Sequence, residues 1–522
     1  MTERSPLSEQ LLQQLPVVYR ERDATGELAR WIAVQGDLLQ AFHDLLMQLY
    51  RDRFPLPERN EDDACQPWVL PYIAELLDVQ MVSTDTAGRR AEVGRAVAWR
   101  QGKGTLRVIR DIAGRLLGKP VAVTEGWQRT ATVARIDRPL LPAAWHGDET
   151  DYRVSDSPVF RAGHPGLPAV TVDVRQAARL VVLSADTEGG VPRARLHHPH
   201  GVPCFPGTHQ DHAPRTVDVR DPDSRHGHVH PRRILIHAVP WDGYFSPRPI
   251  SVRWERIVEG RVPEERLSIT EDEVEIGGEI WPRIRYHAHT DTPLRVRGVI
   301  RLHQRAVFEF HNLWFDNRVE IGEARVILRR CAARHLLVET PDTRRTVLDA
   351  RGCLFNTVET PRGRMRLEYC TVLRELVAEW LECSDAILVP RPKKDRGDTD
   401  IPRGGCIRYS RVEEIPPDER RSDGAESRLR FMPTNTARPP VFLSDRFGEP
   451  GCGVLHAAAP EALRAGAEDG GEMGAYHDER LVQRETAAAR KVQDFLPLGM
   501  RAVFVTDETL RCPTPRLRNP TD

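Results

Sequence analysis

Apolar residues at heptad-like spacing near the N-terminus constrain the fold of this chain more than any other feature. One stripe, with the polar Gln35 inside it, consists of Leu28, Trp31, Leu38, Phe42, Leu45 and Leu49. A second stripe, Ile32, Leu39 and Leu46, lies beside it at intervals of seven residues. This spacing predicts a long amphipathic helix. Because two adjacent stripes exceed what a two-stranded coil buries, we expect a bundle of three or more helices, formed within one domain or with other polypeptides.

The rest of the N-terminal region also reads as helical. A helix announced by Asp62 and Asp63 carries apolar residues at Trp68, Leu70, Ile73, Leu76 and Leu77. Another helix is expected over 86–100. Thr105 can cap a further helix that ends at Gly118, since a side-chain oxygen suits the start of a helix and glycine suits its end. Alternating residues at 121–125 then predict a strand.

The pattern changes to β-structure after residue 126. Alternating Val, Ile and Arg in 171–175 and 233–237 indicate strands. The stretch 196–231 is rich in His, Pro and Asp and is interpreted as an exposed loop or insertion.

Short apolar segments recur at loose intervals over 300–410. Among these segments lie Cys331, Cys353, Cys370, Cys383 and Cys406. Small apolar residues at such intervals suit the stacked interior of a parallel β-helix. Because the intervals are irregular, an antiparallel β-sandwich is the alternative.

The C-terminal part mixes structure types. A charged, Pro-rich stretch over 390–440 is expected to form loops. Helices are predicted at 461–467 and 479–495, and a strand at 502–505.

A chain of 522 residues is long enough for three or four domains. We therefore predict an α+β multidomain protein in which a helical domain precedes β-rich domains. The expected divisions are 1–125 for the helical domain, 126–300 for a β-rich domain, 301–440 for a β-helix-like or β-sandwich domain, and 441–522 for a mixed C-terminal segment.

Charge balance argues against binding by bulk electrostatics. The 75 Lys and Arg residues and the 76 Asp and Glu residues leave a formal net charge of −1. Such a chain has no overall field to attract nucleic acid or an anionic membrane. No uncharged apolar stretch approaches the roughly 20 residues that span a bilayer, so a cytoplasmic location without a membrane span is expected. The nine Cys are too few for a disulfide scaffold.

Catalytic motifs with a recognisable spacing are absent from the sequence. It contains no GxSxG elbow, phosphate-binding loop, HExxH pair or GxGxxG turn. His226, His228 and His230 would share one face of a strand and could bind a transition metal, although a solvated loop is the preferred interpretation. Asp349, Glu382 and Asp385 could act on polysaccharide in a β-helix enzyme, but no spacing pairs them. We therefore expect no enzyme activity, no cofactor and no metal.

Four ordered segments resemble the tail protein I family of contractile phage tails and related injection systems. They are 15–19 (LPVVY), 63–67 (DACQP) before 70–74 (LPYIA), the Arg89-Arg90 helix, and 103–105 (KGT) before the helix that closes at Gly118. Residues 172–175 also resemble the family's strand after the helical domain. Residues 464–474 resemble the C-terminal part of enlarged wedge proteins, which have an inserted β-rich region.

The resemblance implies a structural baseplate wedge subunit. In such a particle the wedge protein binds two copies of a baseplate-J-like subunit through a helical bundle. It also contacts neighbouring wedges, the spike hub and the sheath-initiating proteins, and it transmits the contraction trigger. The residues expected to bind the partner helices are Leu28, Trp31, Leu38, Phe42, Leu45 and Leu49. A β-helix tail enzyme that degrades polysaccharide is the alternative function.

Overall fold

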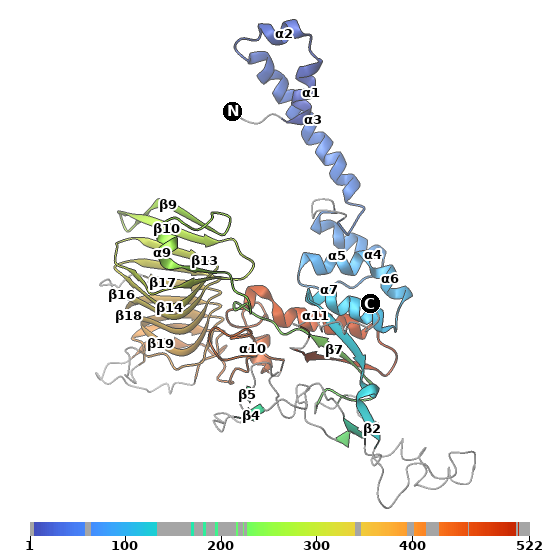
Figure 1. Cartoon of the computed structure of the whole chain (residues 1–522), viewed down its shortest axis with the longest axis vertical. Coiled ribbons are helices and arrows are strands. Elements are labelled where there is room, and N and C mark those ends of the chain that lie inside the picture. Colours follow the sequence, from blue (N-terminus) through green and yellow to red (C-terminus); the bar gives the residue numbers. More distant parts are fainter. Residues whose placement is uncertain are drawn as a thin grey trace, which may run out of the picture. The chain divides into compact units, whose positions relative to one another are not determined.

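The chain forms two compact units, Met1–Gly118 and Lys119–Asp522 (Figure 1). The computed structural model describes residues 5–57, 64–132, 169–171, 181–183, 194–196, 216–217, 223, 227–339, 346–393, 401–413, 427–457, 459–507 and 510. The predicted divisions at residues 125, 300 and 440 stay predictions.

The first unit is helical, as predicted. Its elements are α1 (Pro6–Gln14), α2 (Val17–Arg22), α3 (Glu27–Arg51), η2 (Pro67–Val69), α4 (Leu70–Leu76), α5 (Thr86–Gly94), α6 (Ala96–Gln101) and α7 (Leu106–Leu117). The predicted caps of α7 are both present, since the Thr105 hydroxyl accepts from the Val108 N–H and Gly118 adopts a φ of 67°. The helix predicted over 86–100 is instead two helices that meet at Arg95. Gly94, a poor helix former, lies where the Leu56 side chain packs against its backbone.

The apolar side of α7 supplies much of the core of the first unit. Its buried residues are Val108, Ile109, Ile112, Ala113, Leu116 and Leu117. A second small core joins Cys65, Leu70, Ala74 and Val93. The fully buried Glu92 accepts hydrogen bonds from the backbone N–H groups of Val82 and Ser83, which fixes the approach to α5.

The second unit is organised around a small three-stranded sheet. Its strands are β1 (Val121–Glu125), β7 (Arg233–Ala238) and β23 (Arg501–Thr506), and β7 lies between the other two. The strands predicted at 121–125, 233–237 and 502–505 are thereby confirmed. The helix α11 (Leu481–Gln493) packs on β23. Two long insertions therefore separate the strands of this sheet in sequence, one between β1 and β7 and one between β7 and β23.

The insertion between β1 and β7 contains short elements. They are η3 (Gly126–Arg129), β2 (Thr130–Thr132), β3 (Ala169–Thr171), β4 (Val181–Leu183), β5 (Ala194–Leu196) and β6 (Thr216–Val217). The strand predicted at 171–175 overlaps β3 at Thr171 only, and the remainder of that prediction lies outside the described residues.

The insertion between β7 and β23 contains a sheet of fifteen strands. The first members are β8 (Ser251–Arg253), β9 (Leu267–Ile276), β10 (Glu279–Ala288), β11 (Leu294–Arg297), β12 (Ile300–Leu302), β13 (Val307–His311) and β14 (Leu313–Gly322). The next are β15 (Arg325–Arg329), β16 (Ala332–Glu339), β17 (Thr346–Arg351), β18 (Leu354–Glu368), β19 (Thr371–Ser384), β20 (Ile387–Leu388), β21 (Gly404–Arg408) and β22 (Arg428–Phe431). The helix α9 (Trp254–Val258) lies between β8 and β9, and α10 (Glu461–Arg464) follows β22.

Strand pairing in the large sheet is parallel except between β9 and β10. This pairing does not fit the antiparallel β-sandwich that the sequence left open. The strands stack in layers in Figure 1. The strand register aligns buried residues from one strand to the next. One such row, in register on successive strands and fully buried, is Phe308, Val326, Leu348, Met365 and Leu381.

A left-handed turn residue marks the same corner of successive layers. These residues, with φ between 49° and 60°, are Asn312, Arg330, Gly352, Tyr369 and Asp385. A fully buried residue follows each of them, in order Leu313, Cys331, Cys353, Cys370 and Ala386. Of the recurring Cys residues, Cys331, Cys353 and Cys370 thus occupy interior positions after this corner, whereas Cys383 is buried within β19 and Cys406 is partly exposed. Burial raises the pKa of the Cys331 and Cys353 thiols well above the usual value.

The C-terminal segment returns along this corner, where hydrogen bonds and ring stacking attach it to the large sheet. Asp385 accepts a hydrogen bond from the Glu468 N–H, and the Tyr244 hydroxyl donates to the carbonyls of Gly352 and Ala475. The Tyr369 and His477 rings stack with centroids 3.9 Å apart. The helices predicted at 461–467 and 479–495 correspond to α10 and α11, each shorter than expected.

Candidate partner-binding surface

The first unit covers only one side of the helix α3. Its buried residues are Ile32 and Gly36. Gly36 touches Ser8 of α1 so closely that a Cβ there would come within 2.3 Å of the Ser8 Cα. Asp37 accepts hydrogen bonds from the hydroxyls of Ser5 at 2.6 Å and Ser8 at 2.8 Å, and these bonds lower the pKa of its carboxyl. These contacts fasten α1 to one flank of α3 and leave the apolar stripes uncovered.

The six residues predicted to bind a partner lie on one face of α3, as their spacing requires. Leu28 is half-buried, and the exposed fractions of the other five are Trp31 65%, Leu38 69%, Phe42 59%, Leu45 56% and Leu49 57%. Leu39 and Leu46 of the second stripe are also exposed, whereas Ile32 is buried. The structure therefore brings the predicted residues together without giving them a partner within the described part of the chain.

So much exposed apolar surface on one helix favours an interface. Monomeric proteins rarely leave contiguous apolar patches larger than a few hundred Å². Full burial of one Leu or Phe side chain is worth about 1.5–3 kcal/mol. A partner that covers this stripe would therefore gain a large part of its binding free energy from it.

A second exposed apolar row lies on η2 and α4 and was missed by the sequence analysis. Trp68, Tyr72 and Leu76 follow at steps of four residues and are 62%, 63% and 86% exposed. The Trp68 and Tyr72 rings meet edge to face at 6.2 Å. Their spacing of four residues was the sequence signal that could have indicated this row. Leu70 of α4 is buried in the core, however, and only the packing shows which side of these helices is exposed.

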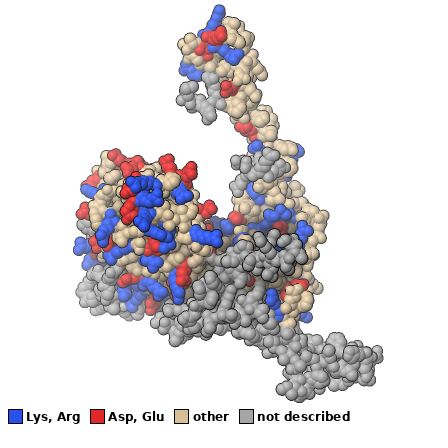
Figure 2. Space-filling view, in the orientation of Figure 1, with Lys and Arg blue, Asp and Glu red and all other residues tan. Residues whose placement is uncertain are grey.

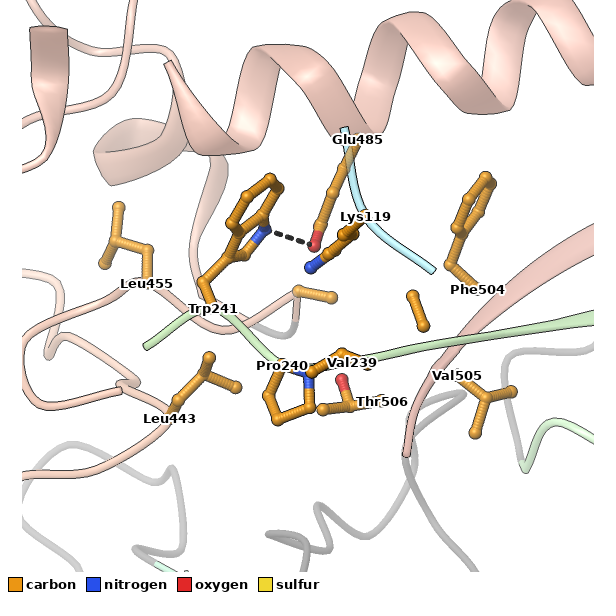
Figure 3. A pocket seen from close by; sticks show the side chains of 12 residues that line it. Lys119, Val239, Pro240, Trp241, Leu443, Leu455, Glu485, Phe504, Val505 and Thr506 are labelled. Carbon is orange, nitrogen blue, oxygen red and sulfur yellow. Dashed lines mark hydrogen bonds between the residues drawn. The ribbon is translucent and has the colours of Figure 1, made fainter. Parts of the chain in front are cut away.

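The second unit offers one shallow pocket beside the three-stranded sheet (Figure 3). Its volume of about 30 Å³ has room for little more than ordered water. The Lys119 ammonium lies 3.5 Å from the centre of the Trp241 ring, and the Trp241 indole N–H donates to Glu485 over 3.3 Å. The other lining residues are Ala238, Val239, Pro240, Leu443, Leu455, Ala457, Phe504, Val505 and Thr506. The Lys119 ammonium, the Trp241 indole N–H and the Glu485 carboxylate thus already have partners within the chain. We therefore interpret the pocket as a structural junction and not as a substrate site.

The histidine motif considered for metal binding does not lie on a strand. His228 and His230 precede β7 in irregular backbone and are buried, so the prediction of a solvated loop is wrong for these two residues. His226 lies outside the described residues. No group of three His, Cys, Asp or Glu side chains in the described part of the chain is placed to hold a metal ion.

The three carboxylates considered for catalysis are not assembled into a site. Asp349 forms an ion pair with Arg329 at 3.1 Å. Asp385 is buried and binds the backbone of the returning C-terminal segment, while Glu382 is exposed on β19, the strand that ends just before Asp385. The contacts of Asp349 and Asp385 are structural.

Among the described residues, the main feature of these surfaces is the exposed apolar face of α3. Residues 35–155 match the phage tail protein family Tail_P2_I, which confirms the predicted relation of the N-terminal region to the tail protein I family. This family assignment indicates a structural role in a phage tail. No curated protein and no solved structure matches the chain. Among the described residues, the helices are too short or too polar to cross a membrane.

Proposed function

We propose that this chain is a structural baseplate wedge protein of a contractile phage tail or contractile injection system. It links the spike hub to the sheath, binds a baseplate-J-like subunit and neighbouring wedges, and transmits the contraction trigger. The observation that carries the proposal is the exposed apolar face of α3 within a region that matches a phage tail family.

The width of the apolar face supports a bundle with more than one partner helix. A single helix packs into a narrow seam of positions three and four residues apart. Here Leu38 and Leu45 lie in one stripe and Leu39 and Leu46 in the next, and all four side chains are exposed. Two partner helices could therefore lie side by side against α3, as two copies of a baseplate-J-like subunit would require.

We further propose that the large sheet is a parallel β-helix that projects from the wedge. Its support is the in-register row from Phe308 to Leu381 and the left-handed residue at the same corner of successive layers. Stacked layers of this kind bury a continuous core while contacting only their neighbours. Such an arm is stiff enough to brace neighbouring subunits.

The test is co-purification of the full-length chain with its baseplate-J-like subunit. The double variant Leu38→Asp and Leu45→Asp should remain soluble and lose the partner, because two charges would have to be desolvated in the interface. The matched variant Leu38→Met and Leu45→Met keeps the apolar volume and should retain binding. Undisturbed assembly of the Asp variant would refute the proposal.

A further inference from the structure

We propose that a basic face on the helical unit of one copy binds the acidic edge of the large sheet in a second copy of this chain. The inference rests on the proposed function, because it assigns the surfaces through which neighbouring wedges meet.

The acidic edge is formed by Glu271, Glu273 and Glu275 of β9. Alternate residues of a strand point to the same side, so the three carboxylates share one face. All three are exposed, and none has an ion-pair partner among the described residues. Acidic side chains line the end of the sheet where β9 lies (Figures 1 and 2).

Several carboxylates elsewhere in the same sheet have Arg partners. Asp272 of β9 points to the opposite side and pairs with Arg283 and Arg285 of β10. Further pairs join Arg295 to Asp316, Arg301 to Glu320, Arg329 to Asp349, and Arg351 to Glu368. The three glutamates of the edge thus lack the Arg partners that these carboxylates have.

The basic face is formed by Lys103, Arg107 and Arg110. Lys103 lies in the turn before α7, and Arg107 and Arg110 lie one turn apart on its exposed side. None of the three forms an ion pair with a described residue, and the first turn of α7 carries no acidic residue. Cations at this end add to the positive end of the helix dipole, which increases the local positive potential.

An exposed apolar residue lies next to the acidic edge, and another lies on the helix that precedes the basic face in sequence. Ile280 of β10 lies opposite Glu275 in the strand register and is 71% exposed. Val97 of α6, the helix that leads to Lys103, is 55% exposed. Charges alone contribute little at a solvated surface, whereas an apolar centre with a charged rim is the usual anatomy of an interface.

A second copy is the occupant that charge complementarity favours. Within the part of the chain that the structure describes, three carboxylates without an ion pair lie on one surface and three cations without an ion pair lie on another. An interface between two different surfaces of identical subunits is heterologous, and repetition of such a contact closes a ring when the rotation permits. The contact is therefore suited to subunits that surround a central hub.

The experiment measures self-association of the full-length chain by sedimentation velocity at low and high ionic strength. The wild type should associate at low salt and dissociate as salt screens the contact. Each triple reversal, Glu271→Lys, Glu273→Lys and Glu275→Lys or Lys103→Glu, Arg107→Glu and Arg110→Glu, should weaken association at least tenfold. An equimolar mixture of the two reversed proteins should associate again, because every contact in it joins opposite charges.

A control separates this contact from a general effect of charge. The variant Glu339→Lys, Glu382→Lys and Glu461→Lys changes net charge equally at exposed glutamates away from the edge and should associate as the wild type does. The inference is overturned by a wild type that stays monomeric at low salt, or by reversed proteins that fail to associate when mixed. It is also overturned if the mixture does not associate but a single chain that carries all six reversals associates as the wild type does. That result would indicate that the two surfaces pair within one copy. Loss of self-association with intact binding of the baseplate-J-like subunit would leave the proposed function standing.

Discussion

The helix α3 and the large sheet handle their apolar residues in opposite ways. In the sheet, the row from Phe308 to Leu381 is fully buried by the strands of the same unit. In α3, Trp31, Leu38 and Phe42 are more than half exposed. The sheet therefore buries its own apolar residues, whereas α3 leaves an exposed apolar face that we propose a partner covers.

Removal of one large side chain from each region gives the largest contrast. Phe310→Ala in the sheet should destabilise its unit by about 3–5 kcal/mol, because it leaves a cavity in a closed core. Phe42→Ala on α3 should change the stability of the isolated protein by no more than about 0.5 kcal/mol. Chemical denaturation of both variants measures the difference. Equal losses would show that α3 buries its own apolar face.

The pH dependence of the second unit tests how closed its interior is. Burial raises the pKa of Glu472 to about 8, although its carboxylate accepts a hydrogen bond from the Leu481 N–H at 2.8 Å. The folded state then keeps a proton that the unfolded state loses above a pKa of 4.5. Stability from this group is complete below the unfolded pKa, falls by up to about 1.4 kcal/mol per pH unit as pH rises, and is lost above the folded pKa.

The matched variant is Glu472→Gln, which keeps an oxygen acceptor and cannot ionise. Its free energy of unfolding should vary less between about pH 5 and 8 than that of the wild type. Urea titrations at several pH values provide the measurement. Parallel curves for the two proteins would contradict a buried, protonated Glu472.

The contact between α1 and α3 should have a smaller effect. Gly36→Ala places a Cβ against the Ser8 backbone and should separate the two helices at a cost of about 1–3 kcal/mol, confined to the first unit. Hydrogen exchange should quicken in α1 and stay unchanged in the large sheet. Loss of protection in both regions would show that the units are coupled.

The smallest effect is expected at the exposed row on η2 and α4. Replacement of Trp68 and Tyr72 by Ser should alter the stability of the isolated protein by no more than about 0.5 kcal/mol. It should also reduce binding of an apolar dye, because two exposed rings are removed. Thermal unfolding and dye fluorescence check both statements, and a large loss of stability would place these rings in the core.

Local sequence signals predicted the elements well where neighbouring residues decide the structure. The heptad spacing of Leu38, Phe42 and Leu45 predicted α3, and Thr105 with Gly118 predicted the ends of α7, because helical periodicity and capping depend on residues a few positions apart. Gly94 was not recognised as a break, since its effect depends on Leu56 from another segment.

Long-range pairing could not be read from the same signals. The intervals between Cys331, Cys353 and Cys370 are irregular because the loops between layers differ in length, although the three residues occupy equivalent interior positions after the same corner. The burial of His228 and His230 could not be predicted either. Polar residues before a strand give the same local sequence pattern whether or not other segments cover them.

The sequence by itself determined that the first part of this chain is helical, that a later part is rich in strands, and that α3 carries two apolar stripes. Periodicity and capping are local, so a single sequence expresses them. Only the tertiary structure decided which stripe residues stay exposed, that Leu70 is buried while Trp68 is not, and that Glu271, Glu273 and Glu275 are exposed. Those outcomes depend on which distant segments pack together, and the free energy of that packing is shared among residues far apart in the chain.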